Sequence, residues 1–165
     1  MPLVCFYYNI KLTFMPTLAE NKKALFDYKA LETLEAGLKL TGPEVKSAKT
    51  GRLVIKDSYA IIDGNLRAWL LNSYIAPYPP AANHQQNYSP DRTRELLLHK
   101  SEIKAWLGQV SRQGLTILPL SVYTKGSFIK VKLILGQGKR KIDKRQTIKK
   151  RELDREINRT LKSRQ

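Results

Sequence analysis

The chain has 165 residues, of which 42% are hydrophobic, so its length suits one domain with a modest core and room for a tail. Thirty Lys and Arg residues face fourteen Asp and Glu, and the formal net charge of +16 indicates a polyanionic partner, either a nucleic acid or an anionic membrane surface. The single cysteine, Cys5, excludes an intrachain disulfide, and the sequence has no apolar run of the roughly 18–20 residues that span a bilayer.

The chain opens on an apolar and aromatic segment, MPLVCFYYNIKLTF, which lacks the basic region and the small-residue cleavage site of a signal peptide. Met15, which Pro16 follows, is a candidate for a second start of translation. We therefore expect residues 1–14 to be an upstream extension outside the fold.

Residues 28–40 alternate loosely between apolar and polar side chains, which predicts a strand bent at Gly37. Residues 41–44 then read Thr-Gly-Pro-Glu, the residue types of a capping box with Pro in the first turn. They predict a short helix over about residues 42–49, which stops at Gly51.

Three short strands are expected next, around residues 53–55, 58–62 and 66–71. Asp63-Gly64 predicts a tight hairpin turn between the last two of them. Residues 78–90 are polar and rich in Pro, so we expect a loop there.

A second helix is predicted to begin at Ser101, as its N-cap, and to end at Gly114. Its apolar residues recur at the i, i+3, i+4, i+7 spacing that places a stripe against a core: Ile103, Trp106, Leu107 and Val110. This stripe predicts that the helix packs along one face of the strands.

Residues 115–123 and 127–135 predict another hairpin, around residues 124–126. In its second strand every other residue from Ile129 to Leu135 is aliphatic, while Lys130 and Lys132 point to the opposite face. Short antiparallel strands with a few short α-helices predict a mainly β fold, a small closed barrel of the oligonucleotide-binding type.

The C-terminal residues change character, because more than half of residues 138–151, GKRKIDKRQTIKKR, are Lys or Arg. Such a segment buries too little apolar surface to fold alone. Leu153, Ile157 and Leu161 recur every four residues and form a thin stripe. We expect a basic tail that is disordered alone and becomes helical on binding a partner.

The sequence contains no constellation typical of an enzyme. His84, His99 and Cys5 lack the spacing of metal ligands, and the common nucleotide-binding and nucleophile motifs are absent. Gly136-Gln137-Gly138-Lys139 lacks the spacing of a phosphate loop, and a hinge before the tail is the better interpretation. We therefore predict no enzymatic activity, no metal and no cofactor.

Three glutamates deserve separate interpretations, since carboxylates are scarce in so basic a chain. Capping accounts for Glu44, and an exposed strand face accounts for Glu32. Glu35 stands in an otherwise apolar strand, and two interpretations stay open. It is either a solvated strand residue or an acceptor for the donors of a nucleobase or ribose.

The basic residues divide into phosphate contacts and ordinary solvated charges, and for each single residue the two alternatives stay open. Each neutralised phosphate adds roughly −0.7 to −0.9 to the slope of log affinity against log salt. Tyr78 and Tyr88 are loop candidates for stacking on bases, whereas Tyr59 and Tyr123 lie in predicted strands and are assigned to the core. The candidate phosphate contacts are Lys22, Lys23, Lys46, Arg92, Arg94, Lys125, Lys130, Lys132, Lys139 and Lys144.

Several segments, in order from Asn21 to the C-terminus, together resemble the SsrA-binding protein family, also called small protein B. The most specific are KDSYA at residues 56–60, RTR followed by LLLHK within residues 92–100, and DKR followed by TIKKR within residues 143–151. The resemblance implies a barrel that binds the tRNA-like domain of transfer-messenger RNA and delivers it to stalled bacterial ribosomes for trans-translation. It also implies that the tail enters the decoding centre and the empty mRNA channel.

The resemblance divides the chain into an N-terminal extension over residues 1–20, expected to be disordered, an RNA-binding barrel over residues 21–138 and a basic tail over residues 139–165. The resulting RNA-binding candidates, among which Glu35, Leu97 and Lys130 match the family position by position, are Asn21, Lys22, Glu35, Lys46, Arg92, Arg94, Leu97, Lys125, Lys130 and Lys132. The candidates for the ribosome-contacting tail are Gly138, Lys139, Asp143, Lys144, Arg145, Ile148, Lys149 and Lys150.

Two positions depart from the family pattern. Phe26 stands where many members carry His, and Glu95 stands where a base is common. The expected partners are transfer-messenger RNA and the ribosome in the cytoplasm, with no membrane or DNA partner, and the chain is expected to be a monomer. The alternatives are a structural ribosomal protein or general RNA-binding protein, and an RNA-processing enzyme.

Overall fold

The structure is a computed structural model, and it describes residues 16–85, 87–140, 156 and 159. In chain order its elements are β1 (Thr17–Glu20), α1 (Lys22–Asp27), β2 (Tyr28–Leu38), α2 (Gly42–Lys49), β3 (Leu53–Val54), β4 (Tyr59–Ile62), β5 (Ala68–Leu71), β6 (Tyr74–Ile75), the 3-10 helix η1 (Pro79–His84), β7 (Arg94–Leu97), α3 (Lys100–Gln113), β8 (Thr116–Lys125) and β9 (Phe128–Gly138).

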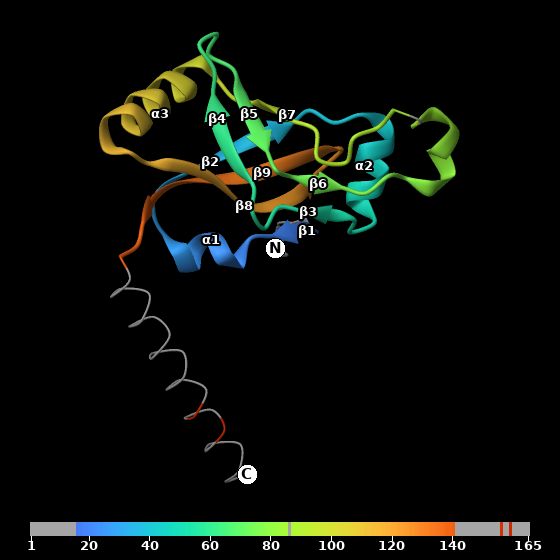
Figure 1. Ribbon diagram of the computed structural model, residues 1–165, viewed down its shortest axis with the longest axis horizontal. Helices are drawn as coiled ribbons and strands as arrows, with labels where there is room; N and C mark the ends of the chain where they lie inside the picture. The colour runs from blue at the N-terminus through green and yellow to red at the C-terminus, as the bar shows by residue number, and fades with distance from the viewer. Residues whose placement is uncertain (1–15, 86, 141–155, 157–158, 160–165) are drawn as a thin grey trace, which may run out of the picture.

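Seven of the strands form one antiparallel sheet in the order β1-β8-β4-β5-β7-β2-β9. Strand β8 also pairs with β9, so the sheet closes on itself as a barrel, with β1 added to β8 (Figure 1). Strands β3 and β6 form a separate two-stranded sheet. The predicted mainly β, small closed antiparallel barrel is therefore confirmed.

The barrel core follows from the alternation along β9. Every second residue from Ile129 to Leu135 is at most 5% exposed, because successive side chains of a strand point to opposite faces. On the other face Ile134 is also buried, in a small cluster with Ala24 of α1 and Leu118 of β8. Helix α1 therefore covers one end of the outer face, and only the hairpin end, with Lys130 and Lys132, stays basic and accessible.

Strand β1 corrects the predicted N-terminal boundary. Its residues, Thr17–Glu20, pair with residues 121–123 of β8, and the amide of Asn21 donates to the carbonyl of Leu120 over 2.8 Å. The expectation of disorder up to residue 20 is thus wrong for these strand residues. Residues 1–15 lie outside the part of the chain that the structure describes.

The predicted hairpin between β4 and β5 is present, but its turn is wider than the tight turn that Asp63-Gly64 predicts. The last cross-strand pair is Ile62 with Ala68, so the connection is longer. The Asp63 carboxylate accepts the amides of Asn65 and Arg67 over 2.9 and 2.8 Å, and these bonds, which the Asp-Gly signal does not reveal, shape the loop.

Both predicted helices are confirmed over most of their length. Helix α2 spans residues 42–49 as expected, and the amide of Thr41 donates to the Glu44 carboxylate over 2.8 Å. Helix α3 ends at Gly114, whose φ of 59° is left-handed, but its N-cap is His99 rather than Ser101. The reason is Glu102, whose carboxylate accepts the His99 amide over 2.9 Å.

The expected loop over residues 78–90 contains η1. Among the residues that the structure describes, no helix is long and apolar enough to cross a membrane.

Candidate nucleic-acid interface

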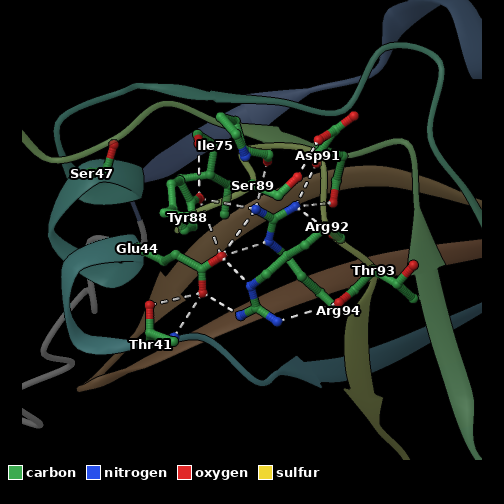
Figure 2. A network of polar contacts seen from close by, with 12 residues as sticks. Thr41, Glu44, Ser47, Ile75, Tyr88, Ser89, Asp91, Arg92, Thr93 and Arg94 are labelled. Atoms are coloured by element: carbon green, nitrogen blue, oxygen red, sulfur yellow. Dashed lines mark hydrogen bonds and ion pairs between the residues drawn. The ribbon is translucent and has the colours of Figure 1, made fainter. Parts of the chain in front are cut away.

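A buried carboxylate organises one side of the barrel. Glu44, in the first turn of α2, has no exposed surface, and its oxygens accept the Nε groups of Arg92 and Arg94 over 2.9 and 3.0 Å (Figure 2). Burial works to raise the pKa of Glu44, but the bonds from Arg92 and the Thr41 amide and the charge of Arg94 hold the pKa below its usual range. We call Thr41, Glu44, Tyr88, Arg92 and Arg94 the Glu44 network. Its ion pairs therefore persist at neutral pH.

Arg94 is the centre of the Glu44 network on the strand side. Its side chain is 0% exposed, and its guanidinium donates to the Ser73 hydroxyl over 2.9 Å and to the carbonyls of Pro90 and Arg92 over 2.7 and 3.0 Å. Tyr88 shares the network, because its hydroxyl accepts the Arg94 guanidinium over 3.2 Å and lies 3.3 Å from a Glu44 oxygen; it also lies 2.9 Å from the Ile75 carbonyl. Arg94 thus ties the loop before β7 to the barrel.

These contacts overturn the predicted role of Arg94 and tie two other candidates, Arg92 and Tyr88, into the fold. The Arg94 guanidinium is enclosed by protein acceptors, so it is a structural group rather than the predicted phosphate contact. Arg92 is a member of the same network, although its side chain is 35% exposed. The Tyr88 hydroxyl is bonded within the network, and the stacking of its ring on bases stays a prediction.

Asn21 is a second predicted RNA contact with a structural role. It is only 3% exposed, and its side-chain oxygen accepts the amide of Ala24 over 3.1 Å, which caps α1. The cap and the bond from its backbone amide to the Leu120 carbonyl hold Asn21 in the fold.

A second carboxylate, Glu35, lies on the outer face of β2. Its oxygens accept the Tyr123 hydroxyl and the Lys130 ammonium, and the Lys125 ammonium lies 3.3 Å away. We call these four residues the Glu35 cluster; they come from β2, β8 and β9, which are neighbours where the barrel closes. The cluster joins one negative and two positive side chains and stays partly open to solvent.

The pKa values within the Glu35 cluster follow from these bonds. The hydrogen bonds from Lys130 and Tyr123 lower the pKa of Glu35 to about 2. Burial and the bond to Glu35 raise the pKa of Tyr123 to about 12. At neutral pH the carboxylate is charged and the phenol keeps its proton, so the donor and acceptor roles are fixed.

An open groove of about 770 Å³ begins beside the Glu35 cluster, and Leu97 of β7 forms part of its wall. Leu97 is 55% exposed and lies opposite Gly37 of β2. A Cβ added at Gly37 would lie 3.2 Å from the Leu97 Cβ, so this glycine permits the close approach of β7. Glu35, Leu97 and Lys130, which the sequence resemblance singled out, thus line one groove. Its other charged residues are Arg67, Glu95, Lys100 and Glu102.

The other predicted basic contacts lie away from this groove. Lys22 of α1 and Lys132 of β9 line a smaller hollow of about 260 Å³. The Lys46 ammonium of α2 lies 5.7 Å from the centre of the Tyr78 ring, a cation–π contact. The structure brings Lys125 and Lys130 together at Glu35, places Lys22 and Lys132 at the smaller hollow, and leaves Lys46 beside Tyr78.

The start of the tail is fastened to the barrel. The Lys139 amide donates to the Asp27 carbonyl over 2.9 Å, and its ammonium donates to the Leu25 carbonyl over 2.8 Å. Gly138 pairs with Tyr28 at the end of β9, beside α1 (Figure 1). The remaining predicted tail residues lie outside the described part of the chain: Asp143, Lys144, Arg145, Ile148, Lys149 and Lys150.

Sequence reasoning missed the role of Tyr123, which it assigned to the core. Val122 and Thr124 are buried in β8, and strand alternation therefore places Tyr123 on the outer face. It also missed the ion pair between Lys39 and Glu95, whose charged groups lie 2.8 Å apart at the edge of the groove. Within residues 16–85 and 87–140, and at positions 156 and 159, no group of three or more His, Cys, Asp or Glu residues is placed to hold a metal ion.

Comparisons with known proteins extend over nearly the whole chain. A family model described as SmpB protein matches residues 18–163. The SsrA-binding protein of Gloeothece citriformis is 48% identical over 145 residues, which cover 88% of this chain and 92% of that protein. The SsrA-binding protein of Streptococcus uberis is 47% identical over 146 residues, with coverage of 88% and 92%.

A solved structure agrees with the sequence comparisons. A chain from the work described as "tmRNA-SmpB: a journey to the center of the bacterial ribosome" is 42% identical and has a TM-score of 0.61. The similarity covers 81% of the present chain and 94% of that chain. Fold and sequence therefore point to the same relatives.

Proposed function

This chain belongs to the SmpB protein family, and from that membership we propose that it is an RNA-binding adaptor that binds the tRNA-like domain of transfer-messenger RNA and delivers it to stalled ribosomes. The observation that carries the proposal is the length of the match. Residues 18–163 include both the barrel and the basic tail, so the whole adaptor, and not the barrel alone, is similar to its relatives. Such an adaptor acts in the cytoplasm, and its task requires binding rather than catalysis.

The groove beside the Glu35 cluster is the proposed binding surface for the tRNA-like domain. Cationic ammonium groups next to an exposed aliphatic side chain match the two chemistries of RNA, because phosphates are anionic and unstacked bases are apolar on their faces. Lys125 and Lys130 supply the charge, and Leu97 supplies the apolar surface. The carry-over of Glu35, Leu97 and Lys130 from the family supports the same surface.

We assign the tail to the ribosome. Its proposed contacts, in the decoding centre and the empty mRNA channel, are Gly138, Lys139, Asp143, Lys144, Arg145, Ile148, Lys149 and Lys150. The bonds of Lys139 to Asp27 and Leu25 fix the point at which the tail leaves the barrel. Barrel and tail thus have separable tasks in this proposal.

The test compares the full chain with a variant truncated after Arg140, which keeps the bonds of Lys139 intact. Both proteins are titrated with a transcript of the tRNA-like domain and with an unrelated structured RNA of equal length at physiological salt. We expect both to prefer the tRNA-like domain, and we expect only the full chain to support tagging of stalled nascent chains in a reconstituted translation system.

Two results would contradict the proposal. Equal affinity for the two RNAs would favour the alternative of a general RNA-binding protein. Retention of the full chain on ribosomes through a high-salt wash, without transfer-messenger RNA, would favour a structural ribosomal protein.

A further inference from the structure

Glu35 is a carboxylate in a surface that must attract phosphates, and its contacts define what it does there. Both of its oxygens are used by the protein itself: one accepts the Tyr123 hydroxyl, and the other accepts Lys130 and lies 3.3 Å from the Lys125 ammonium. A carboxylate has about four lone-pair sites, and three donors of the protein already occupy three of them. At most one bond from a base or a ribose therefore remains for Glu35, and its main partners are within the protein.

The lysines, in contrast, keep free donors. A lysine ammonium has three N–H groups, and Lys125 and Lys130 each direct one of them at Glu35. Their side chains are 47% and 30% exposed, so the remaining N–H groups can reach phosphate oxygens. Long flexible side chains lose rotamer entropy when a ligand fixes them, and a partner that fixes them beforehand removes part of that cost.

We propose that Glu35 is a positioning residue that, with the Tyr123 hydroxyl, holds the ammonium groups of Lys125 and Lys130 together for the RNA backbone and does not itself touch the RNA. This inference rests on the proposed function, since it concerns the same RNA surface. Tyr123 then has a role in RNA binding, and the acidic residue Glu35 belongs to a site that binds anions through its lysines. The site as a whole takes one or two neighbouring phosphates.

The position of the four residues supports this division of labour. Lys130 lies opposite Gly37 on one side of β9 and opposite Tyr123 on the other, so β9 runs between the strand that carries Glu35 and the strand that carries Tyr123. Lys125 reaches the same carboxylate from the end of β8. Without a central anion, two ammonium groups so close together would repel each other and separate.

The decisive experiment places Glu35→Ala in two backgrounds and measures affinity for a transcript of the tRNA-like domain at fixed salt. In the otherwise unchanged full chain we expect Glu35→Ala to weaken binding about fivefold, because the lysines lose their anchor. In a Lys125→Ala/Lys130→Ala double variant the carboxylate has no lysine left to position and only repels phosphate. There we expect Glu35→Ala to leave the affinity equal or to increase it.

The outcomes separate the two roles. Equal or higher affinity of the triple variant supports positioning, whereas any further loss relative to the double variant shows a direct contact of Glu35 with RNA and overturns the inference. A wild-type chain that does not prefer the tRNA-like domain would instead refute the proposed function. Thermal unfolding of every variant verifies that the barrel is intact.

Tyr123→Phe tests the hydroxyl with a minimal change. We expect it to weaken binding about threefold in the wild-type chain and to have no effect in the Glu35→Ala background, because the hydroxyl acts only through that carboxylate. The matched control is Tyr74→Phe, at an exposed tyrosine of β6 outside the groove. Equal losses from Tyr123→Phe in both backgrounds, or no loss in either, would overturn its assignment.

Discussion

The Glu44 network and the Glu35 cluster contain the same kinds of side chain but differ in their roles. Each joins one glutamate to two cationic side chains and a tyrosine hydroxyl. Glu44 and Arg94 are fully buried, whereas the side chains of the Glu35 cluster stay partly open to solvent. Composition does not distinguish a structural ion-pair network from a binding site, but the burial of the central carboxylate does, since Glu44 is 0% and Glu35 is 35% exposed.

The largest effect that sharpens this contrast is expected from Glu44→Ala. Removing the carboxylate leaves the Arg94 guanidinium buried without its ionic partner, and breaking a buried pair in this way costs about 3–5 kcal/mol. Urea unfolding of the variant checks this value. Glu35→Ala is the matched control and should change the free energy of unfolding by less than about 1 kcal/mol, as exposed pairs do.

If Glu44→Ala prevents folding altogether, Tyr88→Phe gives a graded measurement. It removes one hydroxyl from the Glu44 network and should cost about 1 kcal/mol. Equal destabilisation by the Glu44 and Glu35 substitutions would break the comparison between the two groups.

The next largest effect concerns RNA and not stability. Lys130→Ala should weaken binding of the tRNA-like domain about tenfold, the value of one lost charge-assisted hydrogen bond. It should also lower the steepness of log affinity against log salt by roughly 0.7–0.9, because one phosphate is no longer neutralised. Lys104→Ala, at an exposed lysine of α3 outside the groove, is the control.

An unchanged salt dependence of the affinity in Lys130→Ala would show that Lys130 does not contact a phosphate. The free energy of unfolding should stay the same in both lysine variants. A large loss of stability in Lys130→Ala would place the Glu35 cluster with the Glu44 network as a structural group.

The smallest effect is expected in acid. The folded-state pKa of Glu35 is about 2, below its ordinary value of 4.5, so the stabilisation it contributes is present above pH 4.5 and is lost as the pH falls toward 2. Because this carboxylate is 35% exposed, solvent screening keeps the contribution below about 0.5 kcal/mol. Urea unfolding at pH 5 and pH 2.5 should therefore show a slightly smaller loss of stability for Glu35→Gln than for wild type.

The control in acid is Glu20→Gln, at a carboxylate that is 53% exposed and 3.8 Å from Lys22. An identical loss of stability for wild type and Glu35→Gln would show that the cluster does not hold the carboxylate charged. A difference well above 0.5 kcal/mol would make Glu35 structural, like Glu44.

Local signals in the sequence predicted much of the fold. The Thr-Gly-Pro-Glu capping residues and Gly114 gave a helix start and a helix end, and the alternation from Ile129 to Leu135 gave the core face of β9. The errors arose at positions where a side chain can form hydrogen bonds with several nearby backbone amides. Glu102 selected His99 as the cap in place of Ser101, and Asp63 bound two amides that enlarged its turn.

The candidate site was only partly predictable, for a different reason. Arg92 and Arg94 are equivalent in sequence to any exposed basic pair, and only the fold places a buried Glu44 between them. The meeting of Glu35 with Tyr123 likewise depends on the closure of the barrel, which brings together strands far apart in the chain. Long-range pairing of this kind leaves no local pattern to read.

Closure of the barrel also depends on how far the synthesis of the chain has proceeded. Strand β2 has its longest pairing with β9, from Tyr28 opposite Gly138 to Gly37 opposite Lys130, so its main partner is almost the last strand to be made. Until then the edges of β2 and β8 stay unpaired, a state that is slow to fold and open to aggregation. A message broken before the codon for Phe128 would lack all of β9 and would yield an open sheet. A factor proposed to release ribosomes from broken messages therefore depends on a nearly complete message for its own folding.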